Sequence, residues 1–364
     1  LLYDPTAYVV QAVRTVKGSL DVAQFQWAWQ QVIDRHPILR TCFVLQPHTH
    51  TAGMLQVVLK SWSPTWTMGD WTVANGPERE ADYLKSDLAR GFNAAQPMLR
   101  LALFKVADGS HRFVLTVHHA MIDGWSMSLL YAELLAYYSK EKLAAPGSYQ
   151  SMVSYVTATG PAAAQEYWHR QLHAITSPSH LPSPHSSSPA DAVHRHAPDN
   201  YATHAAVMDN ARSMNALAQR HNATASTLLR AALAILLERY TNQRHILFGV
   251  TISGRNAPVD QVESIVGPCI NTIPCHAEVA ADTTLAALLA TMQADSIQAM
   301  PYEQFSLGDV RSCTSIDSSH ALFNTLMVYE NYPAREPSSS CPIELVWQEG
   351  VQNTEYPLTI LATA

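Results

Sequence analysis

The segment 117–126, VHHAMIDGWS, constrains the fold of this 364-residue chain more than any other feature. The apolar residues just before it are typical of a buried strand, and leucines at helical spacing follow it. We therefore predict that a strand ends at His118 and His119 and that the chain turns there before a helix. Asp123 and Gly124 follow at fixed offsets, and a glycine lets a substrate approach the backbone closely. A lone histidine at a strand end is usually only a polar residue, but this combination favours an acyl-transfer site.

These residues resemble the HHxxxDG motif of the condensation domains of non-ribosomal peptide synthetases, and other segments resemble further motifs of that family. They are residues 35–43, similar to RHExLRTxF with Pro37 in place of Glu; 248–256, similar to a strand of fungal members; 265–272, similar to IGxFVNT; and 300–305 and 322–333, which resemble two later motifs. Even without the strand at 248–256, five motifs in the family's order span most of the chain. On this basis the chain is identified as a member of the family.

The resemblance implies an α/β fold with α+β layers. Two chloramphenicol-acetyltransferase-like lobes are expected to form a V-shaped pseudo-dimer, with the histidine motif in a central tunnel. We assign residues 1–175 to an N-terminal lobe and residues 201–364 to a C-terminal lobe. Chains of the family begin earlier and end later than this one, so the C-terminal lobe is expected to be incomplete.

A Ser/Pro-rich linker or loop is expected over residues 176–200, between the two lobes. Ten of the thirteen residues 177–189 are Ser or Pro, a composition that cannot bury enough apolar surface to fold. We therefore expect this stretch to be exposed.

Apolar residues at helical spacing predict helices in both halves of the chain. In the first half, one helix is capped by Asp21 and stopped by Pro37, one covers roughly 78–90, and one runs from Ser126, a possible cap, to about Tyr138. In the second half, helices are expected after Asp209, from Ser226 and over roughly 283–299, with strands at 245–253 and 322–329 and an extended stretch near 267–275. This alternation without sequence repeats favours two similar lobes over one continuous sheet.

The histidine pair carries the expected chemistry. Amide formation from a thioester requires an amine to attack an acyl carbon and a proton to leave the nitrogen, which suits an imidazole of near-neutral pKa. The resemblance implies that His119 is catalytic, either as the base or as the group that positions the amine. Adjacent strand residues point to opposite faces, so His118 is better suited to a structural role, with direct catalysis as the alternative. Gly124 completes the catalytic candidates because it leaves room for a thioester arm.

Other residues are expected to support the site. The resemblance implies that Asp123 forms an ion pair with Arg40 that fixes the loop, and acid catalysis by Asp123 is the alternative. Trp125, Ser253 and Asn271 are assigned to the substrate tunnel. Trp125 is also suited to packing, and the two polar side chains could instead satisfy nearby backbone groups.

Composition excludes several classes of function. The net charge of −7 argues against a nucleic-acid partner, and no apolar run reaches the length of a membrane helix. Five scattered cysteines without a CxxC pair predict a reducing, cytoplasmic compartment and no disulfide framework. No HExxH-like pair is present, so no metal site is expected, and the absence of GxSxG and P-loop patterns argues against a serine hydrolase or an adenylating site.

The leading hypothesis is a fungal-type condensation domain that joins a donor acyl or peptidyl carrier thioester to the amine of an acceptor aminoacyl carrier. The chain itself is expected to bind no cofactor, because phosphopantetheine is supplied by the partner carrier domains; neighbouring synthetase domains are further partners. Related alternatives are a terminal cyclising, an ester-forming or an epimerisation domain, and an acyltransferase that uses coenzyme A. An inactive docking module is the alternative of a different class, against which the intact His119, Asp123 and Gly124 argue.

Overall fold

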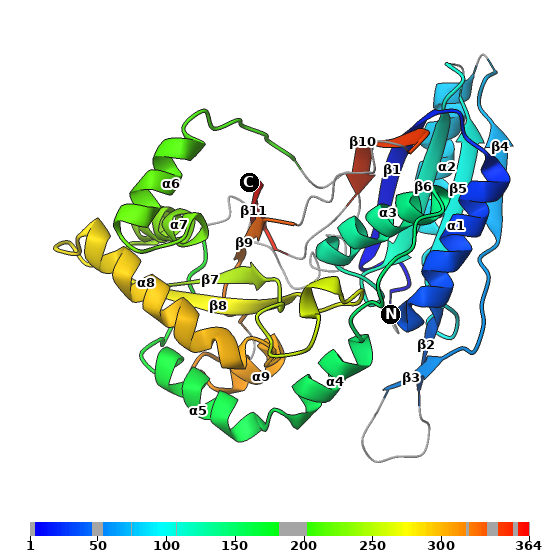
Figure 1. The fold of residues 1–364 in the computed structure, drawn as a ribbon. Coiled ribbons are helices and arrows are strands. Elements are labelled where there is room, and N and C mark those ends of the chain that lie inside the picture. Colours follow the sequence, from blue (N-terminus) through cyan, green and yellow to red (C-terminus); the bar gives the residue numbers. More distant parts are fainter. Residues whose placement is uncertain are drawn as a thin grey trace. The chain divides into compact units, whose positions relative to one another are not determined.

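The computed structural model describes residues 4–45, 54–73, 75–106, 108–181, 202–317, 320–332, 341–351 and 356–363. The chain forms two compact units, each with its own β-sheet (Figure 1). Unit 1 comprises Leu1–Ser151, Asp260–Pro268 and Tyr332–Asn353. Unit 2 comprises Met152–Val259, Cys269–Asn331 and Thr354–Ala364.

The sheet of unit 1 has five strands in the order β10-β1-β6-β5-β4. They are β1 (Val9–Gly18), β4 (Trp66–Asp70), β5 (Leu99–Lys105), β6 (His111–His118) and β10 (Ile343–Val351). Strand β1 pairs antiparallel with β6 and β10, β5 pairs antiparallel with β6, and β4 runs parallel to β5. A separate antiparallel pair is formed by β2 (Thr41–Leu45) and β3 (Met54–Val58). Strand β6, which leads to the histidines, is therefore hydrogen-bonded on both sides.

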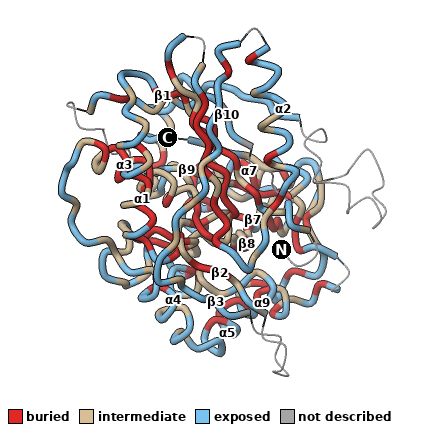
Figure 2. Tube along the Cα trace, turned by 90° about the vertical axis from the view of Figure 1, so that its right-hand side faces the viewer, coloured by how far each residue is buried: buried red, intermediate tan, exposed pale blue. Residues whose placement is uncertain are grey.

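Helices cover both faces of this sheet. They are α1 (Val22–Arg35), α2 (Gly76–Ala89) and α3 (Gly124–Tyr138), with the short η1 (Pro37–Arg40) after α1. Helices α1 and α3 share one core with the sheet, in which the Phe113 ring of β6 lies 5.2 Å from Phe25 and 5.5 Å from Trp29. On the other face of the sheet, Tyr83 of α2 packs with the stacked rings of Trp71 and Phe104 against the strand side chains that point away from α1 and α3. Figure 2 shows how deeply the strands are buried relative to α2.

Unit 2 has a four-stranded sheet in the order β11-β9-β7-β8. The strands are β7 (His245–Ile252), β8 (Asn271–Glu278), β9 (Thr325–Glu330) and β11 (Leu358–Thr363); the helices are α5 (Pro161–Leu172), α6 (Ala211–Arg220), α7 (Ala225–Thr241), α8 (Leu285–Ala299) and α9 (Leu307–Ser312), with short η4 (Val262–Ser264, in unit 1) and η5 (Met300–Tyr302). Helices α7 and α8 pack with Phe248 of β7, and α5 and α9 pack with the neighbouring Leu247. The boundary between the units falls inside α4 (Tyr149–Ala158).

The helices predicted from apolar spacing are present, and their capping residues were partly predicted. Asp21 caps α1, because its Oδ1 accepts from the backbone N of Gln24 at 3.0 Å, and α1 ends just before Pro37. The cap of α3 is Asp123 and not Ser126. The residue before α6 is Asn210, and Asp209 lies one position outside it.

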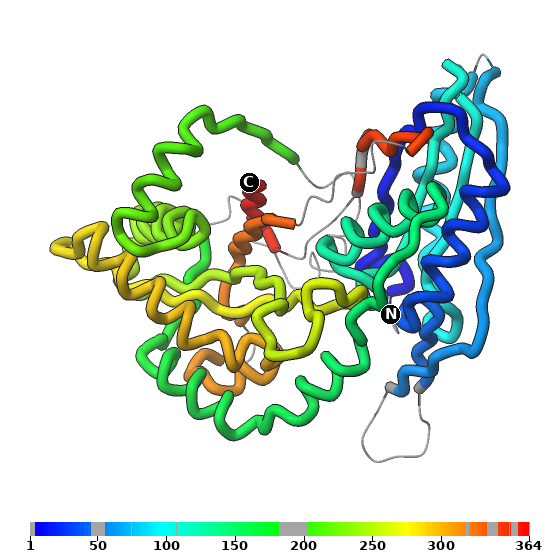
Figure 3. Tube along the Cα trace, in the orientation of Figure 1, coloured from blue at the N-terminus to red at the C-terminus, as the bar shows by residue number. Residues whose placement is uncertain are grey.

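The two units are discontinuous in sequence, unlike the lobes expected over 1–175 and 201–364. Strand β10 pairs with β1 along the register from Gln11↔Val351 to Gly18↔Ile343, so a late segment completes the first sheet (Figure 3). Residues 152–175, assigned to the first lobe, instead belong to unit 2, where Trp168 of α5 is part of the core. Strand pairing between distant segments leaves little local signal, which is why the linear division differs from the observed one.

The predicted linker 176–200 lies partly outside the described residues, because 182–201 are not described. Its described beginning is only partly exposed, because Thr176 and Ser177 are exposed but Ser179 is not. Ser179 is fully buried and forms a parallel bridge with Phe323. Its Oγ accepts from the backbone N of Leu247 at 2.9 Å. The expectation of exposure is therefore wrong for Ser179, since a small serine can enter the core once its hydroxyl has a backbone partner.

Candidate functional site

The histidine pair lies at the end of β6. His118 is the last residue of the strand, pairs with Val9 of β1 and donates its backbone N–H to Met98 at 3.1 Å. His119 follows the strand, and its backbone N–H donates to the carbonyl of Tyr8 at 2.9 Å. The side chain of His118 is buried, whereas His119 is half-buried. Neighbouring histidines therefore occupy different environments, as the strand alternation predicted.

The two imidazole rings hold opposite neutral tautomers. Nδ1 of His119 lies 3.0 Å from the carbonyl oxygen of Ile122. A carbonyl can only accept, so this nitrogen carries the proton and Nε2 is the basic nitrogen. Nδ1 of His118 instead accepts from the backbone N–H of Ala120 at 3.0 Å, so its neutral ring carries the proton on Nε2.

Burial favours the neutral form of both rings. It lowers the pKa of His118 to about 4, with a smaller contribution from the neighbouring His119 and an opposing one from the backbone of Ala7. Burial also lowers the pKa of His119, while the carbonyl of Ile122 and the charge of Asp123 oppose that shift. At neutral pH the site therefore presents an unprotonated His119 Nε2.

Asp123 begins the helix that follows the histidines. It is 3% exposed, and its Oδ1 accepts from the backbone N of Ser126 at 2.8 Å and lies 2.7 Å from Ser126 Oγ. This is N-cap geometry, which satisfies one of the unpaired donors of the first turn of α3. The carboxylate thus fixes the turn that carries Ile122 and the His119 ring.

A distant segment of unit 1 packs against the same turn. Oγ of the fully buried Ser126 accepts from the backbone N of Gly267 at 3.0 Å and lies 3.1 Å from its carbonyl oxygen. Trp125 Nε1 donates to the carbonyl of Glu263 at 2.9 Å. A Cβ on Gly124 would lie 2.4 Å from the hydroxyl of Tyr332, so this glycine allows a close approach. Room for a thioester arm beside Gly124 stays a prediction.

The predicted ion pair between Asp123 and Arg40 is wrong. Within the described part of the chain, Arg40 has no carboxylate partner, and its guanidinium binds backbone carbonyls, including those of Ile33 at 3.3 Å and Asp34 at 3.2 Å. The guanidinium also contacts the carbonyl of Leu59, and the backbone N–H of Leu59 donates to the backbone carbonyl of Arg40. Arg40 therefore holds the chain at the end of α1, and Asp123 serves as a helix cap.

Arg35 and His36, at the start of the motif that also contains Arg40, are the residues that contact α3. Glu133 of α3 is 6% exposed, and its Oε2 lies 3.1 Å from Arg35 Nε and 2.6 Å from His36 Nε2. These contacts join the end of α1 to the middle of the helix that Asp123 caps. Sequence reasoning missed this carboxylate because it lies outside the motifs, on the helix that follows the histidines.

Two of the three residues assigned to the tunnel belong to unit 2. Asn271 donates its side-chain Nδ2 to the carbonyls of Glu303 at 2.7 Å and Phe305 at 3.0 Å. Ser253 Oγ accepts from the backbone N of Arg255 at 3.3 Å. Both side chains thus satisfy local backbone groups, which was the alternative reading of the sequence. Their place in a tunnel, like that of Trp125 in unit 1, stays a prediction.

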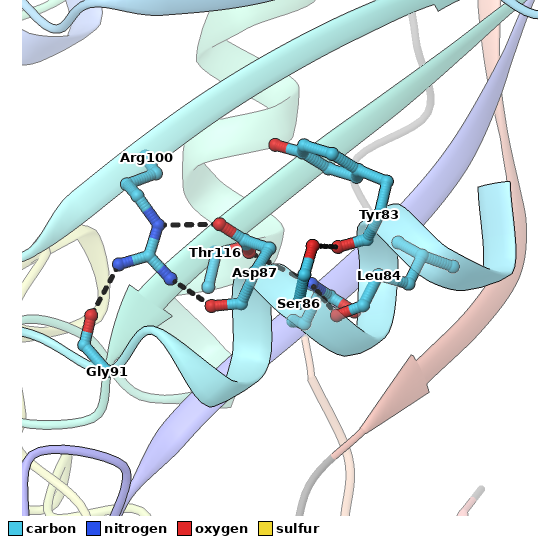
Figure 4. Close-up of polar contacts among 8 residues, drawn as sticks. Tyr83, Leu84, Ser86, Asp87, Gly91, Arg100 and Thr116 are labelled. Carbon is cyan, nitrogen blue, oxygen red and sulfur yellow. Dashed lines mark hydrogen bonds and ion pairs between the residues drawn. The ribbon is translucent and has the colours of Figure 1, made fainter. Parts of the chain in front are cut away.

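Sequence reasoning also missed a buried polar cluster behind the histidine strand. Asp87 of α2 contacts Arg100 of β5 and Thr116 of β6 (Figure 4). A polar threonine inside the apolar run of β6 was the available signal.

Among the described residues, no group of three or more His, Cys, Asp or Glu side chains is arranged to hold a metal ion. Nor is any described helix long and apolar enough to cross a bilayer.

Comparison with known sequences places these observations in a family. A family model described as the condensation domain matches residues 1–363. The chain is 28% identical over 99% of its length to one of the linear gramicidin synthase proteins of Brevibacillus parabrevis and 30% identical over 97% to chondramide synthase cmdD of Chondromyces crocatus. It is 33% identical over 93% to the nonribosomal peptide synthetase ungA of Aspergillus violaceofuscus, a fungal relative. The chain spans only 5%, 9% and 3% of these relatives, respectively.

Solved structures agree on the fold. The condensation domain from the monacolin K polyketide synthase MokA has a TM-score of 0.78 at 18% identity, over 99% of this chain and 85% of that one. A mutant starter condensation domain of rhizomide synthetase RzmA in complex with C8-CoA has a TM-score of 0.75 at 19% identity, over 99% of this chain and 82% of that one. These similarities confirm the predicted mixed α/β, chloramphenicol-acetyltransferase-like fold class.

A pair of double-mutant cycles tests the revised charge pairing. Arg35→Met and Glu133→Gln should be coupled by about 0.5–3 kcal/mol in the free energy of unfolding, because they remove one contact between them. Arg40→Met and Asp123→Asn should be additive within about 0.5 kcal/mol. The measurement is urea unfolding of the four single and two double variants. Coupling between Arg40 and Asp123 as large as in the first cycle would restore the ion pair that the structure lacks.

The buried His118 should make stability depend on pH. Its folded pKa of about 4 lies below the ordinary 6.5, so the unfolded chain takes up a proton as the pH falls below 6.5 while the folded chain does not. Stability is therefore present above that pH and is lost as the pH falls toward 4, by on the order of 2–3 kcal/mol. His118→Asn keeps an acceptor for the Ala120 N–H and should flatten this dependence. An unchanged slope in urea unfolding between pH 7 and pH 4.5 would contradict the assignment.

Proposed function

The chain belongs to the condensation-domain family, and we propose that it forms an amide bond between a donor acyl or peptidyl thioester and the amine of an acceptor aminoacyl thioester. In this proposal, His119 is the base or the group that positions the amine. The observation that carries the proposal is the state of the His119 ring, which is half-buried, favoured in its neutral form and protonated on Nδ1. Its Nε2 is the nitrogen that can accept a proton.

The proposed reaction is a direct acyl transfer. The acceptor amine attacks the thioester carbonyl carbon, so that a C–N bond forms and the C–S bond breaks. The nitrogen becomes positively charged as it attacks, and its proton passes to His119 Nε2 and then to the sulfur, which leaves as a thiol. A general base contributes typically about 10²–10⁴-fold, so much of the remaining acceleration must come from aligning the two reactants.

His119 is a better candidate for this proton transfer than His118. His118 is 3% exposed, and its Nδ1 accepts from the backbone of Ala120. Its burial is consistent with a role in the fold. Asp123 and Gly124 are proposed to support the site, since they fix the start of α3 and thereby the turn to which the His119 ring is bound.

The proposed reactants come from partner domains. Chains like the gramicidin and chondramide synthases are far longer than this one, which spans between 3% and 9% of the relatives named above. We propose that donor and acceptor peptidyl carrier domains present the acyl groups on phosphopantetheine arms and that neighbouring synthetase domains flank this one. The chain would then need no cofactor of its own.

The role of His119 is tested by His119→Ala. Turnover between two loaded carriers should fall by about 10²–10⁴-fold, as expected for the loss of a general base. The unfolding midpoint should change little, because the ring is only half-buried and a hydrogen bond such as that to Ile122 is worth about 0.5–1.5 kcal/mol. His169→Ala, at an exposed histidine of α5, is the control and should leave turnover unchanged. Full turnover in His119→Ala would remove this residue from the mechanism.

The nature of the donor is tested by comparing thioesters. The same acyl group should transfer at least about tenfold more efficiently from a carrier domain than from free coenzyme A, because the carrier surface adds binding and orientation. The comparison matters because one structural neighbour holds C8-CoA. The measured quantity is kcat/KM for each donor at a fixed acceptor concentration. Equal values would favour the coenzyme A acyltransferase alternative.

A further inference from the structure

A buried polar cluster of unit 1, which we call the Asp87 cluster, consists of Gln11, Asp87, Arg100 and Thr116. Asp87 is 5% exposed near the end of α2 and points at the sheet. Figure 4 shows its side chain between Arg100 and Thr116. Burying a carboxylate costs folding free energy unless its oxygens accept hydrogen bonds. The partners of Asp87 therefore show which parts of the fold it holds in place.

The carboxylate of Asp87 binds three strands at once. Oδ1 accepts from Arg100 Nε of β5 at 2.7 Å, and Oδ2 accepts from Gln11 Nε2 of β1 at 3.0 Å and from Thr116 Oγ1 of β6 at 2.5 Å. Thr116 faces Gln11 and Arg100 in the two strand registers, so the partners form one row across the sheet. Arg100 also donates through Nη2 to the backbone carbonyl of Asp87 at 2.7 Å. One side chain of α2 thus fixes the strand row just before the histidines.

The first route from this cluster to the site runs along β6. Thr116 and His118 lie on the same face of the strand, because side chains alternate. His118 ends the strand and is paired with Val9 of β1, two positions from Gln11. A shift of the row at Thr116 therefore moves the residue from which the His119 turn departs.

The second route runs through the segment before β1. Arg100 Nη1 donates to the carbonyl of Gly91 at 2.6 Å, and the next backbone N–H, of Phe92, donates to the carbonyl of Pro5 at 2.9 Å. Gly91 has φ +59°, and a Cβ there would lie 2.5 Å from the Pro5 oxygen. The segment that begins at Pro5 leads to Tyr8, whose carbonyl accepts the backbone N–H of His119. Arg100 therefore supports the backbone partner of the proposed base.

We propose that the Asp87–Arg100 ion pair is the positioning device of the histidine motif, the role that the sequence suggested for Asp123 and Arg40. This inference rests on the proposed function of His119. Asp87 and Arg100 touch no reacting atom and act through β6 and through Tyr8. Because a misplacement of about 1 Å can cost about 10²-fold in rate, an anchor of this kind affects turnover more than binding.

A second ion pair of the same helix and sheet provides a matched control. Arg112 Nε of β6 lies 2.6 Å from Glu80 Oε1 of α2, and each side chain is 19% exposed. This pair joins α2 to β6 near the end of the strand that is farther from His119. If ion pairs between α2 and the sheet only stabilise the fold, both pairs should behave alike.

The experiment compares Asp87→Asn with Glu80→Gln. Hydrogen exchange of the His119 amide should be about tenfold faster in Asp87→Asn, because its bond to Tyr8 opens more often. The kcat for transfer between loaded carriers should fall by about 10- to 100-fold, with KM changed less than about twofold. Glu80→Gln should lower the unfolding midpoint without changing exchange at His119 or kcat.

Thr116→Val extends the test to a milder change. It removes one hydrogen bond of the cluster at almost constant volume, and it should give a smaller change of the same kind; it decides the question if Asp87→Asn does not fold. Unchanged exchange at His119 and unchanged kcat in the variants of the cluster would overturn the proposal. If His119→Ala keeps full turnover, the proposed function fails, but faster exchange at His119 in Asp87→Asn would still support positioning by the cluster.

Discussion

The pairing of β6 on both of its edges is the constraint on which the rest of the site depends. Strands β1 and β5 fix its backbone, and its side chains are buried against helices on both faces. A strand held in this way can neither slip nor twist without breaking two ladders, so the point where the chain leaves the sheet is fixed. His118 occupies that last position, and His119 is therefore presented at a defined place by the backbone of the sheet itself.

The polar residues of this unit have two kinds of role: most support the fold, and His119 is proposed to take part in the reaction. Asp123 is used as a helix cap, Glu133 joins α3 to the end of α1, and Asp87 joins α2 to the sheet. Each of these carboxylates is buried and has specific partners, as the cost of burying a charge requires. Among these groups, His119 is the one whose side chain is both half-buried and basic. Asp123, the carboxylate inside the histidine motif, thus has the same kind of supporting role as Glu133 and Asp87, which lie outside it.

Local signals in the sequence predicted the helix ends well, but the sequence did not predict contacts between distant segments. Asp21 and Pro37 delimit α1 because capping and ring constraints act within a few residues. The pairing of β10 with β1 and the bridge from Ser179 to Phe323 depend on segments far apart in the chain, so composition gave no warning of either. The Asp123–Arg40 pair failed for a related reason. Opposite charges in two motifs can meet, but each found nearer backbone partners, and a backbone group within reach needs no long-range closure.

The orientation of the proposed base and the start of α3 are physically coupled. The His119 ring is held through Nδ1 by the carbonyl of Ile122, and the next residue, Asp123, caps the helix. The hydrogen bond to Ile122 keeps the proton on Nδ1, so the same turn sets both the direction of the ring and the nitrogen that is basic. Burial adds to this by disfavouring the charged forms of both histidines, which would repel each other. Ile122 and Asp123 are adjacent, so the carbonyl that fixes the tautomer of His119 is attached directly to the residue that caps α3.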